Sequence, residues 1–249
     1  MPACQTYFRD SQSRSSRVSS QNRHVGAVVQ VSQAIKTSRF SWVYEGGDAA
    51  SPHSYDEVLR ATANYVVVPS LGALVPGWSL VIPRRPLLNF RDLPVGDRED
   101  LLSLVSDLAA DLSGFGRPVY AFEHGSAQSG SIVGCGVEQA HLHVVPLPFD
   151  LVRAVEADTS AHVTWTRTAA IPLAELPAVA DYVVVWRVDD GAGVVGALRR
   201  PVSQWVRRVI ARELGVEAEW DYRTNPQMMN IKRTVDEMRV QRQPMMSAG

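Results

Sequence analysis

Cysteine, lysine and net charge are all scarce in this sequence, and the shortages exclude several classes of protein. Cys4 and Cys135 are the two cysteines among 249 residues, too few for a disulfide framework, and they form no Cys-x-x-Cys pair for a structural zinc site. The formal net charge of −1 gives no overall field that would attract nucleic acid or an anionic membrane. We therefore expect no nucleic-acid partner, no membrane partner, no bound metal and no cofactor.

Long apolar runs are also missing. No run approaches the roughly 18 residues that a membrane-spanning helix needs, and the first residues lack the apolar stretch of a secretory signal. Together with the few cysteines, these absences favour a reduced, cytoplasmic protein. Residues 1–26 are rich in serine and arginine and poor in acidic residues, and we expect them to form a flexible leader.

Two of the six histidines stand two residues apart in an apolar segment, residues 139–145. Because side chains alternate between faces along a strand, Gln139, His141 and His143 are predicted to share one face and to line one concave site. The apolar residues between them are predicted to face the core, namely Ala140, Leu142 and Val144. Three polar side chains aimed at one place, at the expense of packing, indicate a functional site.

A Gly-rich segment, residues 129–136, leads into this predicted strand. Such a backbone can bring N–H groups close to an anion, so a phosphate-binding surface is expected beside the histidines. The residues expected to bind substrate there are Gly134, Cys135 and Gly136, although Cys135 is alternatively a small packing residue. Imidazoles beside such a surface favour nucleophilic or acid–base chemistry at phosphorus.

The remaining pattern predicts an α+β fold with a mainly antiparallel sheet and flanking helices. Five apolar, β-branched segments are expected to be strands: residues 65–68, 80–82, 119–122, 139–145 and 182–186. One helix is expected from Asp97 to about Gly114 and a second from Val202 to Leu214. The apolar face of the second helix is expected to form a core or the face of a homodimer, through Trp205, Val206, Val209 and Ile210.

Residues 139–145, Gln-Ala-His-Leu-His-Val-Val, resemble the signature of the histidine-triad (HIT) superfamily, which reads His-φ-His-φ-His-φ-φ with φ apolar. Residues 69–83 are similar to the hairpin of that family that ends in Leu-Val-Ile-Pro. The resemblance covers about residues 60–150 and implies a HIT-like domain over residues 27–150. It also implies that residues 151–249 are the C-terminal α/β extension of larger bacterial HIT-like proteins, packed on the HIT-like core.

The resemblance implies a mechanism as well. His141 would attack the α-phosphorus of a nucleotide or nucleotide conjugate and form a covalent nucleotidyl-histidine, which water or another acceptor then resolves. His143 would hydrogen-bond a phosphate oxygen and stabilise the developing charge. His124, expected in the loop after the neighbouring strand, would contact phosphate or ribose, or else is exposed to solvent. The implied activity is that of a nucleotidyl hydrolase or transferase.

Two positions depart from the family pattern. Gln139 replaces the first histidine, and an amide can form hydrogen bonds but cannot shuttle a proton. Pro86 stands where many relatives carry another active-site histidine. These departures leave open a HIT-like protein that binds nucleotide without turnover, or a HIT fold recruited to another biosynthetic reaction. Gln139→His is expected to speed the departure of poor leaving groups by restoring a protonatable group.

Two further interpretations of the histidine pair stay open. His141 and His143 can be structural histidines whose ring nitrogens are satisfied at a strand end. They can also be metal ligands, with a third ligand from the set His124, Glu123, Glu138 and Cys135. The other three histidines have no partner pattern and are expected at the surface, namely His24, His53 and His162.

Overall fold

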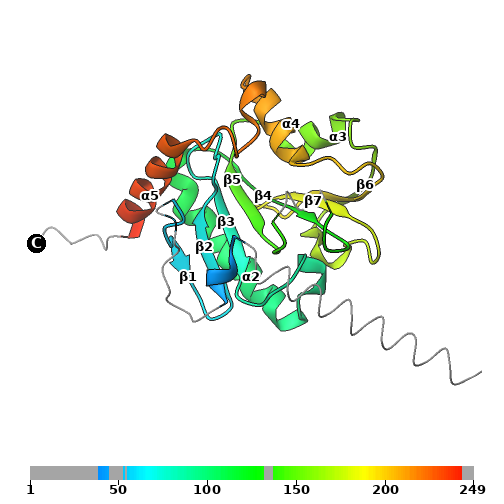
Figure 1. The fold of residues 1–249 in the computed structure, drawn as a ribbon, viewed down its shortest axis with the longest axis horizontal. Helices are drawn as coiled ribbons and strands as arrows, with labels where there is room; N and C mark the ends of the chain where they lie inside the picture. The colour runs from blue at the N-terminus through cyan, green and yellow to red at the C-terminus, as the bar shows by residue number, and fades with distance from the viewer. Residues whose placement is uncertain (1–38, 45–52, 54, 132–136, 243–249) are drawn as a thin grey trace, which may run out of the picture.

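The computed structural model describes residues 39–44, 53, 55–131 and 137–242, and these form an antiparallel sheet with helices on both faces (Figure 1). Within these residues the sheet has eight strands in the order β1-β2-β3-β5-β4-β7-β8-β6, and all neighbours are antiparallel. The strands are β1 (Arg60–Ala61), β2 (Tyr65–Pro69), β3 (Ser79–Pro83), β4 (Val119–Gly125), β5 (Leu142–Pro146), β6 (Val163–Thr168), β7 (Tyr182–Arg187) and β8 (Gly193–Leu198). The predicted α+β fold is confirmed.

Four α-helices flank the sheet in the described part of the chain. They are α2 (Val95–Asp111), α3 (Leu151–Ala157), α4 (Trp205–Glu213) and α5 (Met228–Arg242). Short 3-10 helices connect the longer elements: η1 (Ser41–Val43), η2 (Phe90–Asp92), η3 (Leu112–Phe115), η5 (Pro172–Ala174) and η6 (Glu217–Glu219). None of the described helices is both long enough and apolar enough to cross a membrane.

Alternation along the strands sends side chains into separate cores on the two faces of the sheet. On the first face, Val81 and Val144 join a cluster with Leu101, Leu104 and Leu108 of α2. Each large aliphatic side chain buried in this way stabilises the fold by about 1.5–3 kcal/mol. The apolar positions of the predicted helix therefore face the sheet as the spacing indicated.

The second face of the sheet is covered in two places. Helices α3 and α4 lie together (Figure 1) and pack on β4 and β7, where Phe122 and Val183 contact the cluster that holds Trp205. Around η1, Phe40 packs over β2 and β3 in a separate cluster that includes Leu80. Because the two covers are separate clusters, the middle of this face is left for the cavity described below.

Strands from beyond residue 150 continue the sheet of the first half of the chain. β7 pairs with β4 over six residues, from Tyr120 opposite Arg187 to Gly125 opposite Tyr182. The connection after α4 also docks tightly, because a Cβ on Gly72 would lie 2.5 Å from the Cβ of Tyr222. Gly72 has a φ of +72°, which suits glycine, so both the turn and the close approach require this residue.

The apolar face of α4 is part of the core of the chain itself. Its four apolar residues, Trp205, Val206, Val209 and Ile210, are at most 1% exposed. Of the two roles expected for them, the core role is therefore the one found, and they are not available as a dimer face. Dimerisation itself stays a prediction.

We predict that residues 151–249 do not fold apart from the first half of the chain. A chain that ends at Asp150 would leave β4 as an exposed edge and remove the α3–α4 cover from Phe122. We expect it to aggregate or to lose cooperative urea unfolding, measured by circular dichroism and sedimentation. A truncated chain that unfolds cooperatively, or a stable C-terminal fragment from limited proteolysis of the full chain, would contradict this.

Candidate active site

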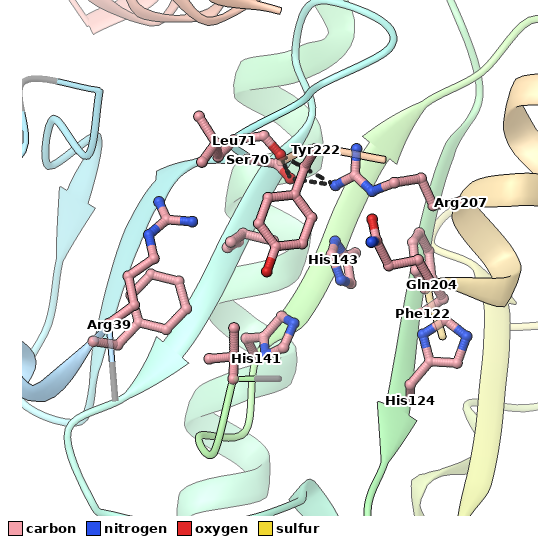
Figure 2. Close-up of a pocket in the computed structure, with 13 residues that line it drawn as sticks. Arg39, Ser70, Leu71, Phe122, His124, His141, His143, Gln204, Arg207 and Tyr222 are labelled. Atoms are coloured by element: carbon pink, nitrogen blue, oxygen red, sulfur yellow. Dashed lines mark hydrogen bonds between the residues drawn. The ribbon is translucent and has the colours of Figure 1, made fainter. Parts of the chain in front are cut away.

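A cavity of about 450 Å³, which includes space open to solvent, lies on the second face of the sheet between the η1 and α4 covers. Figure 2 shows Arg39 and Arg207 on opposite sides of the group that holds His141 and His143. The cavity is lined by Arg39, Phe40, Ser70, Leu71, Leu80, Phe122, His124, Val137, His141, His143, Gln204, Arg207 and Tyr222.

His141 precedes the first residue of β5 and is partly exposed in the cavity. Its Nδ1 lies 2.8 Å from the carbonyl oxygen of Gln139. Because a carbonyl only accepts hydrogen bonds, Nδ1 carries the ring proton, and this assignment follows from the hydrogen-bond partner. Nε2 therefore keeps its lone pair, which is the form of imidazole that acts as a nucleophile.

His143 has the opposite tautomer. The Nε1–H of Trp78 donates to its Nδ1 at 3.0 Å, and an indole nitrogen can only donate. The proton of His143 is therefore on Nε2. The ring is held between two aromatic side chains, stacked on Phe122 at 4.4 Å between centroids and edge-on to Trp78 at 5.7 Å. Its centroid lies 5.0 Å from that of His141.

His124 is buried within β4, so the alternative of a solvent-exposed loop residue is wrong. The backbone N–H of Val206, near the start of α4, donates to its Nε2 at 3.3 Å. Nδ1 therefore carries the proton of this ring. The structure brings His124, His141 and His143 to one cavity. His124 has an N–H at Nδ1 and His143 has one at Nε2, and each can donate a hydrogen bond.

All three imidazoles are neutral near neutral pH. Burial, with the positive charge of Arg39 and Arg207 as a smaller cause, lowers the pKa of His141 to about 4. Burial, and then the neighbouring His141 and Arg207, lowers the pKa of His124 to about 3. The same causes hold the pKa of His143 well below its ordinary value of 6.5. His141 is therefore in its neutral form, with one ring proton, over the whole physiological pH range.

Arg207 brings a buried positive charge from the C-terminal part of the chain. Its guanidinium donates to Ser70 Oγ at 3.1 Å, to the Leu71 carbonyl at 3.3 Å and to the Gly72 carbonyl, and it lies over the Trp78 ring at 4.3 Å. Sequence reasoning missed this residue. One signal was present, because an arginine placed three and four residues before the buried Ile210 and Ala211 lies on the apolar side of the helix.

Comparison with known proteins gives the family. Residues 51–149 match the family model of the HIT domain. The chain carries a HIT domain. The domain over residues 51–149 confirms the resemblance of residues 139–145 to the histidine-triad superfamily, and it supports a nucleotidyl transferase or hydrolase role at the level of the superfamily.

No curated protein matches the sequence of this HIT protein. Among solved structures, it is similar to one described as "Structure of uridylyltransferase", at 10% sequence identity and a TM-score of 0.38. The match covers 79% of this chain and 92% of that chain.

Gln139 does not lie where the HIT signature predicts. β5 begins at Leu142, so the alternation of a strand does not reach back to residue 139. The buried amide instead donates to the carbonyls of Pro83 and Arg85 at 3.1 and 3.3 Å and accepts from the N–H of Leu87 at 3.3 Å. Gln139 is absent from the described residues that line the cavity, and the expectation that it shares their face is wrong.

The other expected residues divide into two groups. Gly134, Cys135 and Gly136 lie outside the described residues, although the adjacent Val137 lines the cavity. The acidic residues considered as metal ligands point elsewhere. Glu123 accepts from the Tyr182 hydroxyl at 2.5 Å, and Glu138 accepts from the N–H of Gly130 at 2.6 Å. The described part of the HIT protein holds no group of three His, Cys, Asp or Glu side chains suited to a metal ion.

We predict that His141→Asn changes how stability depends on pH. Between pH 6.5 and about 4 the unfolded chain binds a proton at His141 that the folded chain does not, so acidification destabilises the wild type through this residue. As pH falls, the unfolding free energy of the wild type should decrease relative to that of the variant by up to about 1.4 kcal/mol per pH unit.

Urea denaturation at pH 7, 6 and 5 measures this difference. Glu123, whose pKa burial raises to about 8, has the opposite pH dependence but is shared by both proteins and cancels. His162→Asn, at an exposed position, is the control and should follow the wild type. Parallel curves for wild type and His141→Asn would show that His141 is not held neutral.

Proposed function

We propose that this HIT protein is a nucleotidyl hydrolase or transferase that forms a covalent nucleotidyl-His141 intermediate at the α-phosphorus of a nucleotide or nucleotide conjugate. One observation carries the proposal. His141 is held with its Nδ1–H on the Gln139 carbonyl, so the lone pair of Nε2 is free to attack within the cavity. Imidazole is a nucleophile when neutral, and the low pKa of His141 keeps it so.

The first step forms a bond between Nε2 of His141 and the α-phosphorus and breaks the bond to the leaving group, which departs with the electron pair. Positive charge that develops on the ring is stabilised by the hydrogen bond from Nδ1 to the Gln139 carbonyl. Nε2–H of His143 is suited to donate to a non-bridging phosphate oxygen, and Arg207 supplies a permanent positive charge.

The second step releases the nucleotide. Water or another acceptor attacks the α-phosphorus, loses its proton to solvent or substrate, and breaks the P–N bond, which restores the lone pair of His141. Transfer and hydrolysis differ only in this acceptor, so the same site supports both reactions.

Proton supply distinguishes this site from one with a general acid. The described residues that line the cavity include no carboxylic acid, and their three imidazoles are neutral at pH 7. A leaving group that departs as a stable anion, such as a phosphate in an anhydride, therefore suits the site better than a simple amine, which must be protonated.

We predict a nucleotide adduct on His141. Wild-type protein incubated with the p-nitrophenyl ester of AMP or UMP should gain the mass of one nucleotidyl group, read by intact-mass spectrometry of rapidly quenched samples. His141→Ala should show no adduct and lose at least about 10³-fold in p-nitrophenol release, because it lacks the nucleophile. His162→Ala is the exposed control. Nucleotide binding without an adduct in wild type would favour the alternative of a binding protein.

We also predict a strong dependence on the leaving group. The p-nitrophenyl ester should react at least about 10²-fold faster in kcat/KM than the phosphoramidate of a simple amine, since acid assistance is worth about 10²–10⁴-fold where it exists. Gln139→His should leave this ratio unchanged, because the side chain at position 139 contacts the backbone of residues 83–87. A faster amine substrate in Gln139→His would contradict this placement and support the expectation from sequence alone.

A further inference from the structure

Gln204 is a buried polar residue of the cavity that the proposed chemistry does not use. It immediately precedes α4, makes no hydrogen bond that caps the helix, and is 2% exposed. We propose that Gln204 determines substrate specificity: its Oε1 accepts a hydrogen bond from an N–H or O–H donor on the nucleoside part of the substrate. This inference rests on the proposed function, because it assigns the part of the cavity that does not hold the phosphate.

The orientation of the amide is fixed by a neighbour. Nε2 of Gln204 donates to Oδ1 of Asp221 at 3.2 Å, and a carboxylate can only accept. The nitrogen must therefore face Asp221, which leaves Oε1 on the other side of the amide. Asp221 is itself held in place, since Oδ1 accepts from the backbone N–H of Arg223 at 3.0 Å. The acceptor of Gln204 is thus positioned before any substrate binds.

Oε1 of Gln204 has no hydrogen-bond partner among the described residues. A buried acceptor without a donor costs free energy, and such atoms in native proteins are few and call for an explanation. Figure 2 shows the amide on the side of the cavity where Arg207 lies, and both line the site where substrate is expected. A donor from the substrate would satisfy this oxygen.

The phosphate cannot be that partner. Phosphate oxygens accept hydrogen bonds, and the cavity offers them the N–H donors of His143 and His124 and the positive charge of Arg207. A carbonyl oxygen placed near a phosphate is repelled by it, so Gln204 must face a different portion of the substrate. The nucleoside has the required chemistry in two places, the amino or imino N–H groups of the base and the hydroxyls of ribose.

The backbone of Gln204 supports a functional role. Its φ of 55° and ψ of 33° are left-handed, a conformation that glycine and asparagine adopt at lower cost than glutamine. Strain of this kind at a residue that also presents an unpaired acceptor is typical of functional sites. Gln227, before α5, has the same φ of 55° and donates from its Nε2 to Glu219 at 2.6 Å, but it does not line the cavity. It is therefore a matched control.

The test compares Gln204→Met, which keeps the length of the side chain and removes the amide, with Gln227→Met in the full chain. Isothermal titration calorimetry with AMP, GMP, CMP and UMP, and with analogues of each that lack the base donor, the 2′-hydroxyl or the 3′-hydroxyl, measures the affinities. Wild type and Gln227→Met should bind one class of analogue about 5- to 100-fold more weakly than its parent. In Gln204→Met that difference should fall to within about two-fold, and the class affected tells base from ribose.

Two results would overturn the inference. In the first, Gln204→Met still binds the analogues more weakly than their parents by the wild-type factor. In the second, its affinity falls by one common factor for every parent and analogue, which would show general damage to the site. If either occurs while the His141 adduct still forms from the p-nitrophenyl esters, the proposed function stands and the role of Gln204 fails. If wild type binds none of the four monophosphates and forms no adduct, both proposals fail.

Discussion

The hydrogen bond from Trp78 to His143 is the interaction on which the site depends. The indole is fully buried and comes from the β2–β3 hairpin, whereas His143 comes from β5. The same indole lies under the guanidinium of Arg207 from α4 and edge-on to Phe122 from β4, at a centroid distance of 5.9 Å. One side chain therefore connects four elements and fixes which nitrogen of His143 carries the proton. Without it, the tautomer of the ring would not be determined.

Burial and fixed charge divide the chemical roles in the cavity. Imidazoles in an apolar surrounding remain neutral, and the nearby Arg207 lowers their pKa further, as Arg39 does for His141. In the proposed function, positive charge for a phosphate is supplied by guanidinium groups, which keep their proton at any physiological pH. His141 keeps a lone pair and His143 keeps an N–H donor, so the proposed nucleophile and the proposed donor do not exchange roles as pH changes.

The sequence predicts the centre of the sheet better than its edges. Each of the five expected strands occurs within three residues of its predicted bounds, because buried strands consist of β-branched residues whose preference is local. The elements β1, α3, β6, β8 and α5 were missed. β6 is an edge strand in the described sheet with alternate residues exposed, and α5 is largely polar, so both depend on the elements they pack against. The continuation of the sheet beyond residue 150 likewise depends on the pairing of β4 with β7, two segments far apart in the sequence.

For the site, the sequence by itself determined the family and the two histidines that face the cavity, because the spacing of His141 and His143 is a local property of the chain. The carbonyl that holds Nδ1 of His141 is local as well, since it belongs to Gln139, two residues earlier. Only the tertiary structure decided the rest. Gln139 turned its side chain away because the strand begins after it, and Gln204 and Arg207 joined the site from more than 60 residues away. Contacts between distant segments leave no periodic pattern in a single sequence, and here they determine which polar atoms meet in the cavity.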